Sequence, residues 1–511
     1  MNENRKVRVR FAPSPTGPLH IGGVRTALYN YLIAKKNNGD FILRIEDTDQ
    51  TRFVKGAEEY IIESLKWLGI EPNEGVGFGN GPHAPYRQSE RKEMYKQYAM
   101  KLVESGYAYY AFDTPEDLES MRERLKASNI DAKYDAITRT TMKNSLTLPD
   151  EEVNERLKSR QPYVIRIKLP RKEEVKFFDE IRGWVSFNTS QMDDKVLFKS
   201  DGMPTYHLAN VVDDYLMQIT HVIRGEEWLP SAPLHVLLYR YLGWEQIMPT
   251  FAHLPLLLKP EGNGKLSKRD GDRLGFPVFP LQWTDPTTGE ISSGYRESGY
   301  LPNAVVNLLA LLGWNPGGNQ ELFSKSELIE LFSLNRVSKA GAKFDVNKAR
   351  WFNQQYLRML SNEEIAVYIK NALKQNNING FDNAYILKAA ELIKEKISFT
   401  NEVWQYANYL FVEPDKYDES IIAKRWNEKT PDVLNELLNN LRNLKDFGKN
   451  EIEATYLKVL EKFGVLPKDF LQLFRVCLTG VAGGPPLFDI AELIGKQNVL
   501  NRISKFLIYK K

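Results

Sequence analysis

Residues 13–23 read PSPTGPLHIGG, and they constrain the fold of this 511-residue chain more than any other stretch. Just before them, residues 7–12 alternate apolar and charged side chains, which is typical of a β-strand. Just after them, apolar residues recur at helical spacing until Gly39, which offers a stop. A second run, residues 41–45, predicts the next strand. The chain therefore opens with a strand–turn–helix–strand unit, which indicates an α/β fold.

The turn in this unit suits the binding of a nucleotide. A turn that leads from a strand into a helix directs unpaired backbone N–H groups and the positive end of the helix dipole at one point, which favours phosphate. His20 adds an imidazole near the helix start. Gly22 and Gly23 lack a Cβ, so a flat ring such as adenine could lie on the backbone. A turn rich in Pro and Gly is more often only a turn, so local chemistry alone makes nucleotide binding a hypothesis.

Length and composition indicate a globular protein of several domains. A chain of 511 residues with 42% hydrophobic residues exceeds one core and can fill several. No apolar run reaches the roughly 18 residues of a membrane helix, and the first strand begins too early for a targeting peptide. The single Cys477 lies in an apolar helical pattern, which favours a buried thiol without a disulfide. We expect a cytoplasmic protein that does not contact membranes.

The charge balance does not by itself indicate binding of nucleic acid. The chain has 69 basic and 66 acidic residues and a net charge of only +3. If RNA is a partner, local basic patches must hold it on a nearly neutral protein.

The order of patterns predicts five regions along the chain. They are the first half of a Rossmann-like domain at 1–106, an inserted α+β domain at 107–203, the second Rossmann half at 204–258, a region with a basic loop at 259–342, and an all-helical region at 343–511.

Several finer predictions concern the middle of the chain. Residues 204–214 are predicted as a strand and its end, and residues 219–224 as another strand. Ser231 is predicted to cap a helix that runs to Gly243. The dense basic stretch 259–275 is predicted as a loop, and residues 277–297, with three prolines, as a surface excursion.

Three groups of residues together resemble one known family. The letters HIGG at 20–23 resemble the HIGH motif of class I aminoacyl-tRNA synthetases, with Gly23 where His is usual. The letters RFAPSPTG at 10–17 and LRIEDTD at 43–49 resemble the glutamyl/glutaminyl branch of that class. The letters KLSKR at 265–269 resemble the KMSKS loop, although an isolated KLSKR is more often a solvated charge cluster. The shared order of these motifs favours the resemblance, which covers nearly the whole chain.

The resemblance to bacterial-type glutamyl-tRNA synthetases implies an activity. Such an enzyme activates L-glutamate with ATP, which brings Mg²⁺, to glutamyl-adenylate, and then transfers the acyl group to the 3′-terminal ribose of tRNA(Glu). Negative charge grows on phosphate oxygens during activation, so ammonium and imidazole donors stabilise the transition state. The residues that the family would use as catalytic donors are His20, Lys265 and Lys268.

The resemblance also implies two binding sites. The ATP site would comprise Pro13, His20, Gly22, Gly23, Glu227, Lys265, Ser267 and Lys268. The glutamate pocket would comprise Arg10, Ser14, Glu46, Tyr206, Asn210 and Arg224. In that pocket Glu46 and Ser14 would hold the α-ammonium group, and an arginine would pair with the side-chain carboxylate through its two-pronged guanidinium.

The other regions take their expected roles from the same resemblance. Region 107–203 would bind the acceptor stem, region 259–342 would contact the tRNA stem, and region 343–511 would bind the anticodon. A glutaminyl enzyme would carry β-barrels in place of the last region. Some family members hold a zinc ion through thiols in the inserted domain, but residues 108–113 and 134–137 contain no cysteine, so no structural zinc is expected. The histidines later in the chain, His207, His221, His235 and His253, are expected to be packed or hydrogen-bonded rather than metal ligands.

Three alternatives stay open at this point. A relaxed glutamyl enzyme would also charge tRNA(Gln). A small-molecule nucleotidyltransferase shares the HIG turn and needs no tRNA, although the long helical region argues against it. A catalytically silent RNA-binding relative would be expected to lose pocket residues that are intact here. The family expectation for the oligomeric state is a monomer.

Overall fold

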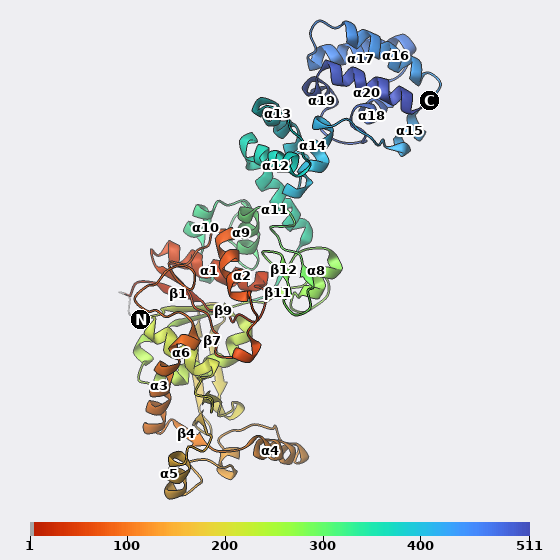
Figure 1. Cartoon of the computed structure of the whole chain (residues 1–511). Coiled ribbons are helices and arrows are strands. Elements are labelled where there is room, and N and C mark those ends of the chain that lie inside the picture. Colours follow the sequence, from red (N-terminus) through yellow and green to blue (C-terminus); the bar gives the residue numbers. More distant parts are fainter. Residues whose placement is uncertain (1–4, 511) are drawn as a thin grey trace. The chain divides into compact units, whose positions relative to one another are not determined.

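The computed structural model describes residues 5–510 and divides them into two compact units (Figure 1). The first unit comprises the residues up to 295 together with 305–346. The second unit comprises 296–304 and the residues from 347 onward.

A seven-stranded sheet forms the centre of the first unit. The strands lie in the order β3-β2-β1-β9-β10-β6-β7, and every neighbouring pair is parallel except β6 and β7. Their bounds are β1 Arg8–Phe11, β2 Asp40–Leu43, β3 Glu74–Gly75, β6 Glu174–Asp179, β7 Gly183–Asn188, β9 His221–Gly225 and β10 Thr250–Leu254. The helix α1 (Ile21–Lys36) connects β1 to β2, which confirms the predicted opening unit.

The strand order reverses at β1, and this reversal determines where a ligand can bind. The chain passes from β1 through α1 to β2 on one side, and later adds β9 and β10 on the other side of β1. In open parallel sheets such a reversal leaves a crevice beyond the carboxyl ends of the central strands. The turn at residues 12–20 follows β1, and the residues from 226 follow β9, so both begin at this crevice.

Helices cover the sheet, and one of them replaces a strand that the sequence analysis predicted. The helices are α2 (Ala57–Leu68), α3 (Lys92–Glu104), α6 (Tyr206–Leu216) and α7 (Ala232–Tyr241). The prediction of a strand at 204–214 was wrong, because these residues form α6, whose Leu208, Val211 and Val212 are buried at helical spacing. The predicted strand at 219–224 is confirmed as β9. The helix after Ser231 begins where predicted, but the Ser231 side chain makes no capping hydrogen bond.

The range 107–203 contributes to two sheets. Three of its strands form a separate antiparallel sheet, namely β4 (Ala108–Ala111), β5 (Val164–Ile167) and β8 (Val196–Phe198). Two helices accompany them, α4 (Pro115–Ala127) and α5 (Asp150–Lys158). The remaining strands, β6 and β7, join the central sheet beside β10.

The region after β10 departs from two predictions. The stretch 259–275 is not only a loop, because a helix, α8 (Lys268–Leu274), forms where the Asp270 carboxylate accepts hydrogen bonds from the N–H and hydroxyl of Ser267. The stretch 277–297 is not only a surface excursion, since Phe279, Leu281 and Trp283 are buried. The ring of Trp283 packs edge-on against Tyr60 of α2. Short strands flank this region, β11 (Leu257–Leu258), β12 (Trp283–Thr284), β13 (Ile291–Ser292) and β14 (Ala342–Lys343), with helices α9 (Pro302–Leu311) and α10 (Lys325–Leu331).

The second unit is built from helices, as the sequence predicts. These are α11 (Val346–Met359), α12 (Asn362–Gln375), α13 (Asn383–Lys394), α14 (Val403–Phe411), α15 (Glu419–Arg425), α16 (Thr430–Asn443), α17 (Lys449–Phe463), α18 (Pro467–Thr479), α19 (Leu487–Ile494) and α20 (Lys496–Tyr509). Among the described residues, none after Lys343 belongs to a strand. Helix α20 packs against α16, α18 and α19 (Figure 1). Cys477 of α18 is fully buried, and burial raises the pKa of its thiol, so the predicted structural thiol is confirmed.

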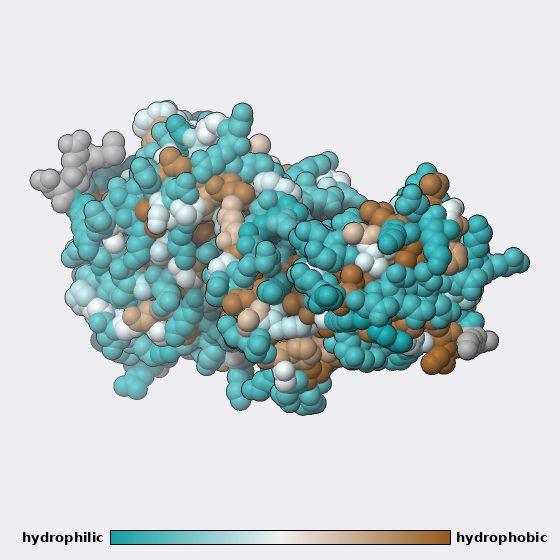
Figure 2. Space-filling model, turned by 90° about the horizontal axis from the view of Figure 1, so that it is seen from above, coloured by the Kyte–Doolittle hydropathy of each residue, from teal (hydrophilic) through white to brown (hydrophobic). Residues whose placement is uncertain are grey.

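On the face drawn in Figure 2, hydrophilic residues predominate and hydrophobic residues form small separate patches. No helix within residues 5–510 is long and apolar enough to cross a bilayer.

Candidate active site

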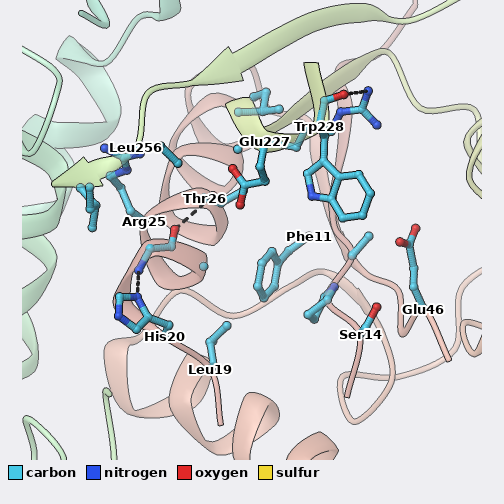
Figure 3. A pocket seen from close by; sticks show the side chains of 18 of the residues that line it. Phe11, Ser14, Leu19, His20, Arg25, Thr26, Glu46, Glu227, Trp228 and Leu256 are labelled. Atoms are coloured by element: carbon cyan, nitrogen blue, oxygen red, sulfur yellow. Dashed lines mark hydrogen bonds between the residues drawn. The ribbon is translucent and has the colours of Figure 1, made fainter. Parts of the chain in front are cut away.

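A cavity of about 690 Å³ opens at the carboxyl ends of β1 and β9, where the strand order reverses. The sequence-predicted site residues that line it are Arg10, Pro13, Ser14, His20, Gly22, Gly23, Glu46, Tyr206, Asn210, Arg224, Glu227 and Lys265. Ser267 and Lys268 do not line it. In the close view, Ser14, Glu46 and Trp228 gather at one end of the cavity and His20 lies at the other (Figure 3). The cavity therefore has two chemically different ends.

His20 presents a hydrogen-bond donor at its own end of the cavity, away from Ser14, Glu46 and Trp228. Its Nδ1 accepts a hydrogen bond from the backbone N–H of Gly22 at 3.1 Å, so His20 caps α1. Burial, helped by the charge of Lys265, lowers the pKa of His20 to about 4, so the ring is neutral at pH 7 with its proton on Nε2. This Nε2 is buried and has no hydrogen-bond partner within residues 5–510. A buried donor without a partner is costly, which favours a ligand acceptor such as a phosphate oxygen.

The start of α1 differs from the prediction in one respect. The backbone N–H of Ile21 donates to the carbonyl of Val278 at 2.9 Å, and that of Gly23 donates to the carbonyl of His20 at 2.8 Å. With Gly22 bonded to the His20 ring, the predicted unpaired N–H groups at these three positions are all paired within the protein. Phosphate recognition at this end must therefore rely on side chains and on the helix dipole.

Gly23, the departure from the HIGH pattern, has a local structural reason. A Cβ at position 23 would lie 2.6 Å from Cδ1 of Leu19, a distance that real Cβ atoms do not show. Leu19 is buried and lines the cavity. The glycine therefore allows Leu19 to pack against the first turn of α1.

The two lysines of the basic loop lie in different surroundings. The Nζ of Lys265 lies 3.4 Å from Oε1 of Glu227 at the edge of the cavity, and both side chains are about half exposed. The Nζ of Lys268 lies outside the cavity lining, 2.8 Å from Oε1 of Glu290. The structure thus brings Lys265 to the predicted site but not Lys268.

A buried network of four charged side chains lies below the end of the cavity that contains Ser14, Glu46 and Trp228. Arg10 donates two hydrogen bonds to the Asp214 carboxylate, from Nε at 2.9 Å and from Nη2 at 3.2 Å. Arg44 bridges Asp214 at 2.7 Å and Glu46 at 2.8 Å. Burial alone would raise the pKa of Asp214, but the Arg10 and Arg44 guanidinium groups lower it below its ordinary value. The network therefore balances two cations with two anions and fixes Glu46 at the cavity.

Arg224, by contrast, is a buried cation with neutral partners. Its Nε donates to Nε2 of His253 at 3.0 Å, and its Nη1 donates to the Tyr206 hydroxyl at 3.0 Å. Its Nη1 also lies 3.3 Å from Nδ1 of His235, and burial holds the pKa of that imidazole well below its ordinary value. No carboxylate within residues 5–510 forms an ion pair with Arg224. The cavity therefore carries an uncompensated positive charge.

Sequence reasoning missed several residues that build this site. Arg44 lies within the LRIEDTD motif and Asp214 ends the stretch 204–214, but neither was assigned a role. His253, which contacts Arg224 on the side away from the cavity, and Asp179, which bonds to His253, were also missed. Trp228, Leu19, Arg25 and Thr26 also line the cavity. The signal that could have found Asp214 is a pair of adjacent aspartates on an apolar stretch, because buried carboxylates require cationic partners. The expectation that His235 and His253 are hydrogen-bonded is confirmed.

No cluster of metal ligands occurs in the described part of the chain. Within residues 5–510, no group of three or more His, Cys, Asp or Glu residues is arranged to hold an ion. The expectation that the protein has no structural zinc stays a prediction.

Comparison with known proteins places this architecture in a class. Residues 6–351 match the catalytic domain of class I tRNA synthetases (E and Q), and residues 355–507 match an anticodon binding domain. The parallel sheet, the HIGG turn and these matches together define a class I tRNA synthetase.

Three similar proteins indicate which tRNA synthetase family within this class the chain belongs to. The chain is 56% identical over 504 residues to a glutamate–tRNA ligase of Amoebophilus asiaticus, covering 98% of this chain and 97% of the relative. It is 57% identical over 502 residues to one of Phocaeicola vulgatus, covering 98% of each. A crystal structure of a glutamate tRNA ligase from Elizabethkingia meningosepticum in complex with its amino acid superimposes with a TM-score of 0.95 at 50% identity, covering 99% of this chain and 100% of that one. The chain therefore belongs to the glutamate–tRNA ligase family.

Proposed function

We propose that this protein activates L-glutamate with ATP to glutamyl-adenylate and transfers the acyl group to the terminal ribose of tRNA(Glu). The observation that carries the proposal is the charge of the cavity. Arg224 is a buried cation without an anionic partner, and Glu46, although it pairs with Arg44, presents a carboxylate acceptor at the same end of the cavity. An amino acid with an acidic side chain carries the complementary pattern of one ammonium group and one extra carboxylate.

The glutamate would bind at this end in a defined orientation. The Arg224 guanidinium would pair with the side-chain carboxylate mainly through Nη2, whose contact with the Trp228 carbonyl is long at 3.5 Å, whereas Nη1 already contacts Tyr206 and His235. Glu46, held by Arg44 at 2.8 Å and by Asn210 at 3.1 Å, would accept from the α-ammonium group. The α-carboxylate would then point toward the other end of the cavity. Arg10 would contribute less to charge recognition than Arg224, because Asp214 already neutralises it.

ATP would occupy the end that contains His20. A glutamate oxygen would attack the α-phosphorus, the bond to the β-phosphate would break, and diphosphate would leave. The neutral His20 would donate its Nε2–H to a phosphate oxygen, and Lys265 would add a positive charge. Lys268 would join them only after it leaves Glu290. Mg²⁺ would arrive with ATP as part of the substrate. Each donor of this kind contributes about 2.7–4 kcal/mol to the transition state in a comparable site.

A second cavity supports the transfer of the acyl group to tRNA. It measures about 410 Å³, and Tyr206 lines both cavities. Its lining includes three cations from the inserted range, Arg122, Arg166 and Lys195, of which Lys195 pairs with Asp193 of the same lining. Such cations suit the phosphates of an acceptor end. The terminal 2′-hydroxyl of the tRNA would attack the adenylate carbonyl and release AMP.

We propose that the range 107–203 contacts the acceptor stem, 259–342 the tRNA stem and 343–511 the anticodon. We also propose that the protein acts as a cytoplasmic monomer without structural zinc.

The test is the transfer of labelled glutamate to purified tRNA(Glu), with tRNA(Gln) and labelled glutamine in parallel reactions. Charging of tRNA(Glu) alone supports the proposal, and charging of both tRNAs with glutamate indicates the relaxed form of the enzyme. If neither tRNA accepts glutamate, the proposal is wrong. Amino-acid-dependent formation of AMP without tRNA charging would then favour a nucleotidyltransferase.

A further inference from the structure

Asp179 and His253 form a buried chain of hydrogen bonds on the side of Arg224 away from the cavity, and we call this chain the relay. Both side chains are fully buried, and Nδ1 of His253 lies 2.6 Å from Oδ2 of Asp179. On the opposite edge of the ring, Nε2 of His253 accepts the hydrogen bond from Nε of Arg224 at 3.0 Å. The three residues come from β6, β10 and β9, which are adjacent in the central sheet. The relay therefore joins the hairpin of β6 and β7 to the cavity.

The relay fixes the tautomer of His253. Arg224 can only donate, so Nε2 must be an acceptor, and the ring proton must lie on Nδ1, where Asp179 accepts it. Burial lowers the pKa of His253 below its ordinary value even though Asp179 opposes this effect, so the ring is neutral. Burial would raise the pKa of Asp179, but hydrogen bonds from His253 and from the backbone of Arg182 and Ile181 lower it, so Asp179 is ionised.

A comparison of the two cavity arginines shows what the relay achieves. Arg10 is paired directly with a carboxylate, that of Asp214, and its charge is neutralised. Arg224 is also held by a buried carboxylate, but a neutral imidazole separates the two groups. The guanidinium is therefore oriented without being neutralised, and its charge is left for a ligand.

We propose that Asp179 and His253 are positioning residues that give the site its preference for glutamate over glutamine, an inference that rests on the proposed function of Arg224. An oriented guanidinium without a counter-charge binds a carboxylate through charge-assisted hydrogen bonds, here from Nη2, since Nε and Nη1 already contact His253, Tyr206 and His235. A carboxamide can offer the same guanidinium only one acceptor and no charge. Discrimination therefore depends on keeping an anion away from Arg224 while holding its plane in place.

The substitution Asp179→Asn tests the relay and keeps the acceptor at Oδ1, although Oδ2 also accepts from the backbone N–H of His253 at 3.1 Å and that bond would be lost. The Asp179 Oδ1 accepts from the N–H groups of Ile181 at 3.0 Å and Arg182 at 2.9 Å, and an asparagine oxygen can do the same. The asparagine NH₂ would then face Nδ1 of His253 as a donor. The ring proton would move to Nε2, where it would oppose the Nε–H of Arg224.

The experiment measures the Kd values for glutamate and for glutamine by calorimetry on the full-length protein and its variants, with unfolding curves as a check of folding. We expect Asp179→Asn to weaken glutamate binding by about tenfold to a hundredfold, because a charge-assisted contact is misaligned. Glutamine binding should change much less, so the ratio of the two Kd values should fall. Asp194→Asn is the matched control, since Asp194 is an equally buried carboxylate, bonded to Tyr109 at 2.7 Å and Arg139 at 2.9 Å, that does not line the cavity.

A second variant distinguishes loss of the relay from general damage to the core if Asp179→Asn folds poorly. In His253→Gln, the amide oxygen can accept from Arg224 whatever residue occupies position 179. The double variant Asp179→Asn with His253→Gln should therefore bind glutamate more tightly than Asp179→Asn alone, a rescue that general damage to the core cannot produce.

The outcomes separate the relay from the site itself. If Arg224→Gln leaves glutamate binding intact, the proposed glutamate site is wrong. If Arg224→Gln abolishes binding while a folded Asp179→Asn retains the wild-type ratio of Kd values, the relay inference is wrong and the proposed function stands. Absence of rescue in the double variant would also overturn the relay.

Discussion

Lys268 forms an ion pair with Glu290, with Nζ 2.8 Å from Oε1, and this pair holds the second lysine of the KLSKR motif away from the cavity. Glu290 lies between β12 and β13, in the stretch that also places Phe279 against the ring of His20. The stretch 277–297 therefore contacts both motifs of the proposed ATP site. Binding of ATP would have to exchange a protein carboxylate for a phosphate at Lys268.

The first prediction concerns this exchange. Glu290→Gln should lower the KM for ATP by up to about fivefold, because an exposed ion pair contributes about 0.2–1 kcal/mol. Lys268→Ala should reduce the rate of glutamyl-adenylate formation by about 10²–10³. Steady-state charging at varied ATP concentration measures both effects. Glu261→Gln is the control, since Glu261 pairs with Arg273 of the same helix α8 at 2.9 Å and should leave the KM unchanged. A Lys268→Ala variant with ordinary turnover would contradict the assignment of the loop.

The second prediction concerns the stability of the charge network. Asp214→Asn should lower the free energy of unfolding by about 3–5 kcal/mol, because Arg10 and Arg44 would lose a shared buried anion. Urea unfolding measures the change. Glu119→Gln removes an exposed partner of Arg122 and should change stability by less than about 0.5 kcal/mol. Equal stability of the two variants would show that the network does not hold the fold.

The third prediction is a loss of folding stability at acid pH, caused by two histidines that burial keeps neutral. Burial lowers the pKa of both His20 and His207 to about 4, whereas an unfolded histidine titrates near 6.5. Below pH 6.5 the unfolded chain binds protons that the folded chain does not, so stability is complete above pH 6.5 and falls as the pH drops toward 4. Each histidine should cost about 3 kcal/mol over this range. Urea unfolding between pH 7 and 4 should show a shallower loss in His207→Gln, and an identical slope would contradict the prediction.

The fourth prediction concerns the glycine that replaces the last histidine of the HIGH pattern. Gly23→Ala should destabilise the protein by about 1–3 kcal/mol, because its Cβ would overlap Leu19. In a Leu19→Ala background, Gly23→Ala should cost less stability than it does in the unaltered protein, because the overlap is gone. Thermal unfolding of the unaltered protein, the two single variants and the double variant measures this difference. Additive effects of the two substitutions would mean that the overlap is relieved elsewhere.

The sequence predicted the elements that local patterns specify. The strand, turn and helix around His20 follow from alternation, Pro and Gly clusters and helical spacing, all within about 40 residues. The position of the cavity follows as well, because a turn after a central parallel strand must open at its carboxyl end. Most of the predicted site residues line that cavity.

The errors come from partners that are distant in sequence. The prediction of a strand at 204–214 overlooked the helical spacing of Leu208, Val211 and Val212. It also could not include the ion pair of Asp214 with Arg10, 204 residues away, which helps to stabilise α6. The stretch 277–297 was predicted as a surface excursion from its three prolines, yet Tyr60 of α2 provides a ring against which Trp283 packs. The relay of Asp179 and His253 was invisible for the same reason, since strand pairing alone brings the two side chains together.

The role of Arg224 in recognising the substrate is tested most directly by the ratio of glutamate to glutamine affinity in Arg224→Gln compared with the unaltered protein. We predict a strong preference for glutamate in the unaltered protein and its loss in the variant. Glutamate affinity should fall by more than about a hundredfold, because one partner of a buried charge pair is removed. The Kd for ATP should stay unchanged, which confirms that the cavity is still formed. A variant that still prefers glutamate by the original ratio would contradict the claim that Arg224 recognises the substrate side chain.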